Sequence, residues 1–563
     1  MKAADWIVDF LISRGVTEAF GLPGAVILEL LYAMDRRKPE LTPHLSYHEQ
    51  GAAFAACGYA QATGKIGVAY ATRGPGMTNM LTAIADAYYD SVPVMFLTAH
   101  SSGKTRPGMR VENNQEIDTV AIASGVAKYA VRIDEASALQ REIQNAYTAA
   151  TTGRKGPVFL DIASSVLRQE ISMEAPPVQE ESAPTDIGAI SDEIAAKLLN
   201  ASRPVVLIGN GVRQSETVMM VRELAEKAGI PVLSSRLSHD VFPDSPMYYG
   251  FIGSHGTRYG NFILSKADLI LALGNRMAFP QDSKSFRPVV DNTVIIRVDI
   301  DESEFLRKVP GSICYYADLR ALLPELLEKD LSYSNRDHWT AVCEKLKQSL
   351  NQWDKTPVVE ALMRIVTAAE KESTFVCDVG NHSFLATNAC VYSNAQNRVL
   401  YSGSFGTLGS ALPKAVGAYY GTRRPVICFS GDQGFQMNIQ ELQAISQYRL
   451  PVMIVVINNS ASAMIREREE KQYAHLVHTT RESGYEVPDL QAVAAAYRLG
   501  YRCIEDLGKF LEEDFAPGSY PCLVELRTDG GERLHPNLPQ GRVCQDLAPS
   551  IPEELYRQLE GLR

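Results

Sequence analysis

The chain has 563 residues, a length for which about 100–200 residues per domain gives three to four domains. Hydrophobic residues make up 45% and charged residues 21% of the chain, a balance typical of a folded globular protein that excludes a disordered one. The 66 acidic residues outnumber the 55 Lys and Arg, for a net charge of −11, and no basic block stands out. We therefore expect no nucleic-acid-binding or anionic-membrane surface.

The beginning of the chain, MKAADWIVDFLISRGV, predicts an amphipathic helix and not a signal peptide, because Asp5 and Asp9 interrupt its apolar run. No apolar run approaches the ~20 residues that a membrane-spanning helix needs. The nine cysteines are scattered without a CxxC pair or a neighbouring His cluster. This pattern favours reduced thiols and predicts neither a zinc site nor a disulfide framework. We expect a cytoplasmic protein without a membrane partner.

Short β-branched runs alternate with helical stretches along the whole chain, as in parallel sheets that helices cover on both faces. Two segments with the composition of linkers, 172–188 and 328–357, divide the chain into three pieces. The predicted fold class is α/β, with three doubly wound parallel-sheet domains over residues 1–171, 189–330 and 357–545, and a C-terminal tail over 546–563. The predicted strands are 67–72, 93–99, 157–162, 203–211, 267–274, 292–301, 373–380, 424–432, 450–459 and 520–528.

Two of these strands in the last third are followed by oxygen-bearing side chains. Asp432 stands at the end of one predicted strand and Asn459 at the end of the next. Ligands of open α/β sheets bind outside the carboxyl ends of the strands, and oxygen ligands suit Mg²⁺. Gly431 and Gly434 would let the backbone approach a phosphate. A strand-end turn and an Asn-containing loop without a ligand is the alternative, because short motifs are weak evidence.

The combination of GDQG (431–434) with NN (458–459) is more specific, and it resembles the pattern of thiamin-diphosphate enzymes. The resemblance extends over nearly the whole chain and points to the acetolactate synthase group. It implies thiamin diphosphate and Mg²⁺ as cofactors, a pyrimidine-binding first domain, a central FAD- or nucleotide-binding-like domain and a diphosphate-binding third domain. Gln433 departs from the family's usual Gly. The other similar segments are FGLPG (20–24), HEQGAAF (48–54), GPG (74–76), DVGNHS (378–383) and GSFGTLGSALPKAVGA (403–418).

The same resemblance implies roles for individual residues. Glu49, among apolar neighbours that help a carboxyl group keep its proton, is expected to hydrogen-bond the aminopyrimidine ring as a catalytic residue; a first-turn glutamate that stabilises its helix is the alternative. Leu408 is expected beneath the cofactor, with one more core leucine as the alternative, and Gln115 near the reacting carbons. The expected metal ligands are Asp432, Asn459 and the Ala461 carbonyl. The expected cofactor contacts are Pro23, Gly24, Gly76, Gly380, Asn381, His382, Gly406, Leu408, Gly431, Asp432, Gln433, Gly434, Asn459, Ala461 and Met464.

Two further sets of residues are implied less directly. Aligned on NN, Glu467 and Arg468 stand where branched-chain relatives have the Gln-Trp pair that selects the acceptor. Arg468, together with Asn114, is a candidate acceptor contact, and a solvated charged helix face is an equally weighted alternative. The family's RFDDR segment is RMAFP (276–280) here, so the match ends after its arginine. The candidate FAD contacts are Gly209, Gly211, His255, Gly274, Arg276, Asp299 and Asp318.

The function that the resemblance implies is decarboxylation of a 2-keto acid, pyruvate first, with ligation of the acyl unit to a second carbonyl compound. A different acceptor, such as a keto-sugar or a larger aldehyde, and simple decarboxylation are the alternatives. A scaffold without catalysis is opposed by Glu49, Asp432 and Asn459 together. The resemblance also implies a homodimer or homotetramer with active sites at the subunit interface. The acceptor, FAD binding and a regulatory subunit are left open by the sequence.

Overall fold

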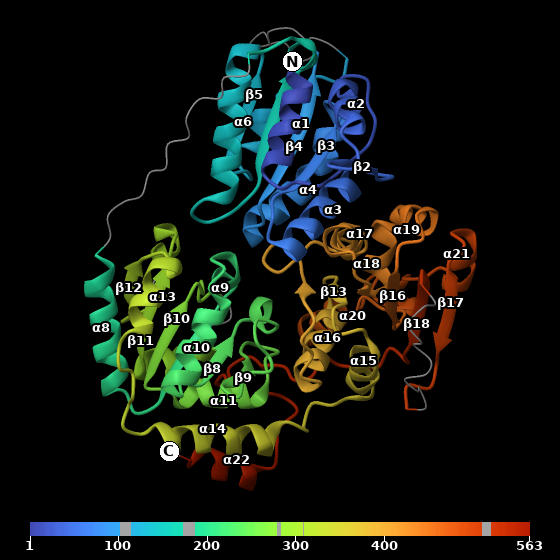
Figure 1. Cartoon of the computed structure of the whole chain (residues 1–563). Helices are drawn as coiled ribbons and strands as arrows, with labels where there is room; N and C mark the ends of the chain where they lie inside the picture. The colour runs from blue at the N-terminus through green and yellow to red at the C-terminus, as the bar shows by residue number, and fades with distance from the viewer. Residues whose placement is uncertain (102–113, 173–185, 279–282, 308, 509–519, 563) are drawn as a thin grey trace.

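The computed structural model of the chain describes residues 1–101, 114–172, 186–278, 283–307, 309–508 and 520–562. Over these residues the chain forms three parallel sheets of six strands each, flanked by helices (Figure 1). The predicted α/β class with three doubly wound sheets is therefore confirmed. Among the described helices, none combines the length and the apolar character that a bilayer span requires. Most of the predicted linker 172–188, and Phe279 and Pro280 of the RMAFP segment, lie outside the described residues.

The first domain has the strand order β2-β1-β3-β4-β6-β5. Its helix α3 begins where the His48 side chain accepts the backbone N–H of Gln50, and it ends at Gly64, whose φ of +73° suits a helix C-cap. The elements are α1 (Ala3–Ser13), β1 (Glu18–Gly21), α2 (Leu28–Arg36), β2 (Thr42–Leu45), α3 (Glu49–Thr63), β3 (Gly67–Ala71), α4 (Pro75–Asp90), β4 (Val94–His100), α5 (Thr119–Ala123), β5 (Tyr129–Ile133), α6 (Ala136–Thr151), β6 (Val158–Ala163) and α7 (Ser164–Arg168).

The central domain has the order β12-β11-β10-β7-β8-β9, the dinucleotide-fold order of a doubly wound sheet. Its elements are α8 (Ile187–Asn200), β7 (Pro204–Ile208), α9 (Gly211–Gln214), α10 (Val218–Ala228), β8 (Val232–Ser234), η1 (Arg236–Ser238), β9 (Tyr248–Phe251), α11 (Arg258–Lys266), β10 (Leu269–Leu273), η2 (Lys284–Phe286), α12 (Arg287–Asn292), β11 (Val294–Asp299), η3 (Glu302–Leu306), β12 (Ile313–Tyr316), α13 (Leu319–Leu327) and α14 (Arg336–Leu350).

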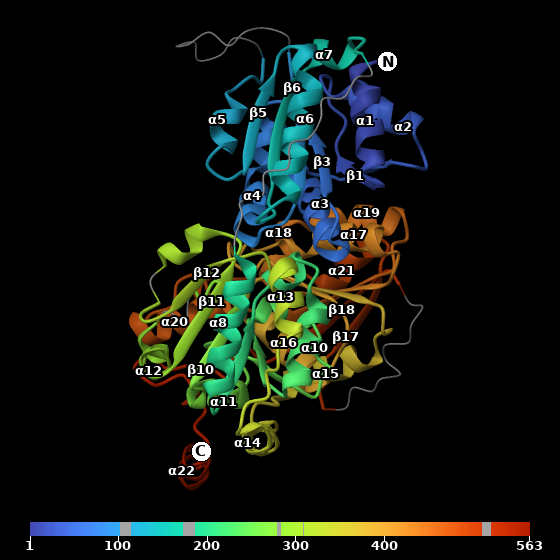
Figure 2. The ribbon, with the colours of Figure 1, turned by 60° about the vertical axis from the view of Figure 1, so that its left-hand side comes forward.

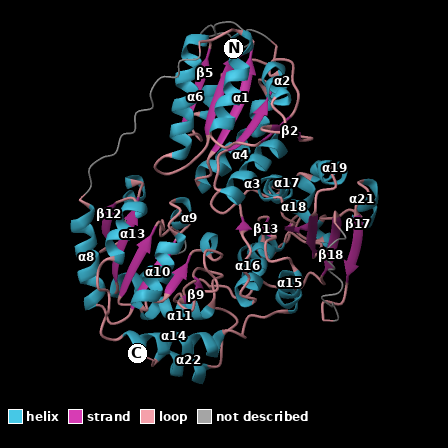
Figure 3. Cartoon of the chain, in the orientation of Figure 1, coloured by secondary structure: helices cyan, strands magenta, loops and turns pink. Residues whose placement is uncertain are grey.

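The third domain repeats the strand order of the first, as β14-β13-β15-β16-β18-β17. Figure 3 shows its strands in magenta and the helices around them in cyan. Its elements are α15 (Pro357–Ala368), β13 (Thr374–Cys377), α16 (Asn381–Tyr392), β14 (Val399–Leu400), α17 (Ala411–Thr422), β15 (Val426–Gly431), α18 (Asp432–Met437), η4 (Ile439–Glu441), α19 (Leu442–Gln447), β16 (Val452–Asn458), α20 (Ala463–Gln472), η5 (Arg481–Ser483), α21 (Leu490–Ala496), β17 (Gly500–Ile504) and β18 (Cys522–Arg527). The helix α22 (Glu553–Glu560) follows near the end of the chain.

The first and third domains share one hydrophobic core, which runs from the first sheet through α3 and α17 to the third sheet. Figure 2 shows these two helices side by side. Small residues let the two helices touch along their backbones. A Cβ on Gly58 would lie 2.1 Å from the Lys414 carbonyl oxygen, and one on Gly417 would lie 1.8 Å from that of Ala55. This contact holds the middle of α3, the helix that begins at Glu49, against the third domain.

The region 328–357, interpreted from its polarity as a linker, contains α14 in the structure. Trp339 on this helix is fully buried, and its indole N–H donates to the Pro204 carbonyl of the central domain at 3.0 Å. The end of the chain also returns to the central domain, where Leu559 is buried in that domain's core. The two segments therefore stabilise the central domain beyond its own sheet and helices.

Candidate active site

Asp432 lies at the carboxyl end of β15, beside the turn that follows β16. The two strands pair in parallel, with Gly431 opposite Ile457. Asp432 is buried, and its Oδ1 accepts the Tyr485 hydroxyl at 2.6 Å, whereas its Oδ2 is buried without a partner among the described residues. Burial raises the pKa of this carboxyl, although the Tyr485 hydroxyl and nearby backbone N–H groups favour the anion. An anionic oxygen without a donor suits a bound cation.

The two asparagines after β16 have different surroundings. The Asn458 side chain points back to the sheet and donates to Glu525 of β18 at 2.7 Å. Asn459 starts the turn, and its Oδ1 accepts the backbone N–H of Ala461 at 3.1 Å. Backbone N–H groups of Asn459 and Ser460 also contribute to the environment of the Asp432 carboxylate, so the turn adjoins that carboxylate. Carboxylate, amide and carbonyl oxygens fit Mg²⁺, which would be held by Asp432, Asn459 and the carbonyl of Ala461.

The DVGNHS segment lies at the end of β13, the strand on the other side of β15. His382 is buried in the first turn of α16; burial lowers its pKa to about 4, and its Nε2 has no partner among the described residues. Gly380 has a φ of +144°, and a Cβ there would lie 2.9 Å from the His382 ring. A neutral imidazole at a helix N-terminus is suited to contact an anionic group. Asn381 instead donates to Glu467 of α20 at 3.0 Å.

Asp378, the first residue of the segment, joins the loops of the third domain and was not singled out from the sequence. Its carboxylate accepts the backbone N–H of Gly409 at 2.9 Å and the Ser430 hydroxyl at 3.2 Å. A Cβ on Gly434 would lie 2.3 Å from its Oδ2, so the GDQG loop needs a glycine there. Burial raises the pKa of Asp378 to about 6. Asp378 thereby ties the Leu408 loop to the end of β15.

Leu408 is 37% exposed, which favours the position beneath a cofactor over that of a core leucine. Nothing lies within 4 Å of a Cβ built on Gly406, whose φ is +76°. The neighbouring Gly409 carbonyl accepts the Asn438 side chain at 2.8 Å, and the same amide group donates to Gln50 of α3 at 3.1 Å. The residue after Glu49 is therefore connected to the residue after Leu408 through one asparagine.

Glu49 is the first residue of α3, where its carboxylate accepts the Asn79 side chain of α4 at 2.9 Å. Gly76, at the start of α4, is close enough that its Cβ would lie 3.6 Å from Glu49 Oε1. The exposed Gln115 contacts the turn at Gly74, just before α4: a Cβ on Gly74 would lie 2.1 Å from the backbone carbonyl oxygen of Gln115. The segments that the sequence assigned to the pyrimidine side thus gather at the amino end of α3.

Four other predicted cofactor contacts lie in the first domain or in the third. A Cβ on Gly24 would lie 2.5 Å from the Thr72 side chain, so Gly24 permits a close approach of two strand-end loops. Pro23 is exposed beside it. In the third domain, Gln433 is half-buried in the first turn of α18, and Met464 is exposed at the start of α20. The departure at Gln433 is accommodated because its side chain stands in the helix and the close contact to Asp378 falls on Gly434.

The candidate acceptor residues point in different directions. Glu467 lies toward α16, where its carboxylate accepts a hydrogen bond from the Asn381 side chain. Arg468 is exposed and donates to Gln472 on the same helix at 3.2 Å. Asn114 is exposed next to Gln115. The structure therefore brings Asn114 to the pyrimidine side of the site and leaves Arg468 on the solvent side of α20.

Three of the candidate FAD residues pack against one another. A Cβ on Gly209 would lie 2.1 Å from the Gly274 carbonyl, and one on Gly211 would lie 2.6 Å from the Gly274 Cα. These glycines are therefore required for the close contact of two loops. The interpretation of their spacing as a dinucleotide cradle stays a prediction.

The other candidate FAD residues have partners within the protein. His255 Nδ1 is 3.1 Å from the Pro536 carbonyl oxygen, Arg276 is paired with Glu304 at 3.1 Å, and Asp318 is paired with Arg320 at 2.6 Å. Asp299 accepts the backbone N–H of Asp301 at 3.0 Å. These contacts hold the candidate residues within the protein, and their role in FAD binding stays a prediction.

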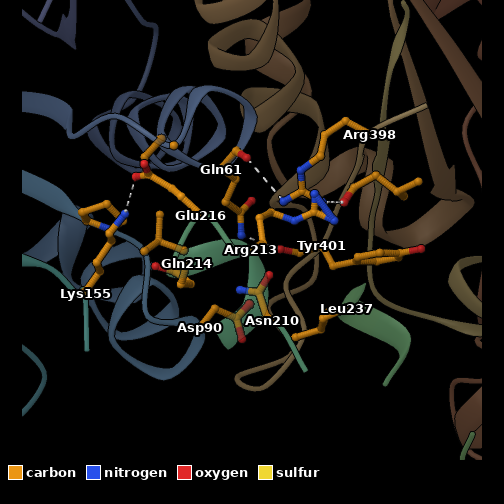
Figure 4. Close-up of a pocket in the computed structure, with 15 residues that line it drawn as sticks. Gln61, Asp90, Lys155, Asn210, Arg213, Gln214, Glu216, Leu237, Arg398 and Tyr401 are labelled. Atoms are coloured by element: carbon orange, nitrogen blue, oxygen red, sulfur yellow. Dashed lines mark hydrogen bonds and ion pairs between the residues drawn. The ribbon is translucent and has the colours of Figure 1, made fainter. Parts of the chain in front are cut away.

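A cavity of about 70 Å³ lies where the three domains meet (Figure 4). Gln61 and Asp90 of the first domain, Asn210 and Arg213 of the central domain and Arg398 of the third domain contribute to its lining. A ligand site for a drug-sized molecule has roughly 300–1,000 Å³. This cavity borders the glycine loop at Asn210, and a dinucleotide does not fit in it.

Comparison with known proteins gives matches over all three domains. Residues 1–122 match the thiamine pyrophosphate enzyme N-terminal TPP binding domain, residues 191–326 the central domain, and residues 378–526 the C-terminal TPP binding domain. The acetolactate synthase large subunit of Lactococcus lactis subsp. lactis (strain IL1403) is 32% identical, over 96% of this chain and 95% of the relative. The isozyme 2 large subunit of Escherichia coli (strain K12) is 30% identical, over 98% and 100%.

Proposed function

This chain belongs to the thiamine pyrophosphate enzyme family and is an enzyme of the acetolactate synthase type, and from that premise we propose that it decarboxylates pyruvate and ligates the acyl unit to a second carbonyl compound. The observation that carries the proposal is the unpartnered, buried Oδ2 of Asp432 beside the Asn459–Ala461 turn. It supports Mg²⁺ as the ion that would anchor the diphosphate of the cofactor there.

When bound, thiamin diphosphate supplies the electron sink that lets a 2-keto acid lose CO₂. The residues of this chain provide the surroundings. Glu49 would exchange a proton with the aminopyrimidine ring, with Asn79 holding its other oxygen. Leu408 would support the cofactor from below, and the neutral His382 would contact the diphosphate. Gln115 and Asn114 would border the space of the reacting carbonyl groups.

The experiment that tests the proposal is product analysis by mass spectrometry. Purified protein is incubated with thiamin diphosphate, Mg²⁺ and pyruvate, first alone and then with a panel of ketone, keto-acid and aldehyde acceptors. We expect CO₂ release and acetolactate from pyruvate alone. Acetaldehyde as the sole product would favour simple decarboxylation, and preferential capture by another acceptor would favour the alternative carboligation. The absence of CO₂ release from every 2-keto acid would contradict the proposal.

We further propose a homodimer or homotetramer with active sites at the subunit interface. Large apolar side chains are exposed on the loops and helices around the candidate site, and exposed apolar surface of this kind marks interaction sites. Within one chain the first domain already contacts the third through α3 and α17, so the interface arrangement is supported by the resemblance and by these exposed side chains and not by the contacts of the single chain. These exposed residues are Phe405, Leu408, Met437, Met464 and Ile465.

Subunit mixing tests this arrangement. Glu49→Gln and Asp432→Ala subunits are each expected to be inactive alone, and they are unfolded and refolded together. If each site combines Glu49 of one subunit with Asp432 of another, a mixed dimer contains one intact site and activity returns. If both residues of a site belong to one chain, the mixture stays inactive, and the interface proposal is wrong.

FAD binding is supported by the resemblance and by the strand order of the central sheet, whereas the candidate residues already have partners within the protein. The proposed decarboxylation and ligation do not include FAD. A yellow protein whose flavin band is released by denaturation would establish it. A colourless protein that turns over fully and gains no absorption on incubation with FAD would exclude it.

A further inference from the structure

One loop of the third domain, residues 479–485, contacts two of the three candidate metal ligands, the Asp432 carboxylate and the backbone of Ala461. We propose that Tyr485 in this loop is a positioning residue for the metal site: it fixes the Asp432 carboxylate and thereby sets the affinity for Mg²⁺ and the Mg²⁺-dependent binding of thiamin diphosphate. This inference rests on the proposed function, because it takes Asp432 as the metal ligand.

The Tyr485 hydroxyl fixes one oxygen of Asp432 and leaves the other for the ion. Its hydroxyl donates to Oδ1 at 2.6 Å, and both residues are buried, with 9% of Tyr485 and 2% of Asp432 exposed. Oδ2 has no hydrogen-bond partner among the described residues. A carboxylate with one oxygen held by a neutral donor keeps its full negative charge and a single orientation.

The loop also contacts the backbone of Ala461, the second of these two candidate ligands. Thr480 forms an antiparallel bridge with Ala461, and the backbone N–H of Ser462 donates to the Thr479 carbonyl at 2.9 Å. The two sides of the Ala461 peptide are therefore fixed by the same segment that carries Tyr485. A movement of the loop would displace a carboxylate and a carbonyl oxygen together.

The loop is itself rigidly closed. Thr480 and Ser483 form a reciprocal capping box around η5, and the backbone N–H of Tyr485 donates to the Thr480 carbonyl at 2.8 Å. The Thr479 hydroxyl donates to Glu469 of α20 at 2.7 Å. Tyr485 is thus anchored at its backbone within a few residues of the ring, so its hydroxyl has little freedom to leave Asp432.

Mg²⁺ demands near-ideal octahedral geometry, so it is sensitive to the orientation of each ligand. Loss of a group that orients a metal ligand typically costs 10–100-fold in metal affinity. We therefore expect Tyr485→Phe, which removes only the hydroxyl, to weaken Mg²⁺ binding in the presence of thiamin diphosphate by about 10- to 100-fold. Raising the Mg²⁺ concentration should restore cofactor binding.

The control is Tyr333→Phe, because the buried hydroxyl of Tyr333 donates to the Gly229 carbonyl at 3.0 Å in the central domain, away from the candidate ligands. Mg²⁺ is titrated by calorimetry into each full-length protein with saturating thiamin diphosphate, and thermal unfolding is recorded without either ligand. The expected result is weaker Mg²⁺ binding for Tyr485→Phe, wild-type binding for Tyr333→Phe, and an unchanged midpoint of unfolding for ligand-free Tyr485→Phe.

Asp432→Ala and the double variant with Tyr485→Phe complete the test. If Tyr485 acts through Asp432, the second substitution adds no further loss to the first. Equal Mg²⁺ affinity of Tyr485→Phe and wild type would overturn the inference, as would a fall in ligand-free stability without a change in Mg²⁺ dependence. A wild-type protein that binds thiamin diphosphate without regard to Mg²⁺ would overturn the proposed metal site as well, which separates the two failures.

Discussion

The buried carboxylate of Glu441 in η4 accepts the backbone N–H of Tyr47 at 3.2 Å, two residues before Glu49. This hydrogen bond crosses from the third domain to the first. A Cβ on Gly51 would lie 2.1 Å from the Glu441 carboxylate, so a glycine in the first turn of α3 is needed to admit it. The orientation of Glu49 therefore depends on a residue 392 positions away in the chain, counted from Glu49 to Glu441.

The Glu441 contact predicts a pH dependence of stability. Burial raises the pKa of Glu441 to about 7 from an ordinary value of 4.5, although the backbone N–H groups of Tyr47 and His48 oppose the shift. The folded protein therefore binds a proton that the unfolded chain has lost between these values, and this contribution to stability is full below pH 4.5 and lost as pH rises through 7.

Glu441→Gln remains neutral throughout and keeps an oxygen for the Tyr47 N–H. Between pH 4.5 and 7 the free energy of unfolding of wild type should therefore fall, relative to that of the variant, as pH rises. Urea titrations at several pH values measure this difference. Parallel pH dependences of the two proteins would show that Glu441 does not titrate in this window.

The salt bridge between Lys414 of α17 and Asp86 of α4 predicts a large effect on stability. The two charged groups are 2.8 Å apart and each side chain is 1% exposed, in the core shared by the first and third domains. Removing one partner leaves a buried charge, at a cost of roughly 3–5 kcal/mol. We expect this loss for Lys414→Met in urea unfolding.

The matched control is Arg424→Met, which breaks an exposed pair with Glu372 in the same domain. An exposed pair contributes about 0–1 kcal/mol. A similar effect of both substitutions would show that the buried pair is worth no more than a surface one.

For Glu49, the expected outcome is a loss of turnover with retained cofactor binding. Glu49→Gln preserves the bond to Asn79 but removes the proton, and general acid–base assistance is typically worth 10²–10⁴-fold, so turnover should fall by about that much. Calorimetry should still detect thiamin diphosphate binding. A variant with wild-type turnover would disprove the catalytic role.

Asp432→Ala addresses cofactor retention. The substitution removes the anionic metal ligand, so thiamin diphosphate should be lost on gel filtration at ordinary Mg²⁺ concentrations. Its measurement is the cofactor content of the purified protein. Full occupancy in Asp432→Ala would place the ligand elsewhere.

The sheets and the strand-end site could be predicted from the sequence because they depend on local patterns. The runs at 424–432 and 450–459 are apolar on both faces, which indicates buried parallel strands, and the ends of adjacent parallel strands meet at one edge. Asp432 and the Asn459 turn follow from this geometry. The linker interpretation of 328–357 was wrong because it followed the overall polarity of the segment and not the apolar residues that recur at helical spacing in α14. Its buried residues are Trp339, Val342, Cys343, Leu346 and Leu350.

The residues that hold the site in place could not be predicted in this way. Tyr485, Glu441 and Asp378 act through contacts formed only in the folded chain, and 53 positions separate Tyr485 from Asp432. Asp378 was within a recognised segment, and an acid at the end of a buried strand was the available signal. The FAD contacts stay a prediction, because a glycine that admits a ligand and a glycine that admits a neighbouring loop look the same in a sequence.

Arg468 provides the test of acceptor selection. It stands where branched-chain relatives have a Trp, and its exposed guanidinium bonds only to Gln472 among the described residues, which leaves donors to bind a carboxylate with parallel hydrogen bonds. Loss of such a contact costs about 1.5–3 kcal/mol, or roughly ten- to a hundredfold in use of an anionic acceptor. Arg468→Trp should therefore shift the products from keto-acid acceptors to uncharged aldehydes.

Release of CO₂ from the donor should hardly change in Arg468→Trp, because Glu49 and Leu408 are untouched. Lys471→Trp, which places the same indole at another exposed position of α20, controls for the added apolar surface. The measurement is the ratio of ligation products in paired acceptor competitions, with CO₂ followed in parallel. If both variants give the wild-type ratio with every acceptor pair, Arg468 belongs to a solvated helix face and the acceptor is selected by other residues, because an exposed charge that touches no substrate cannot discriminate among substrates.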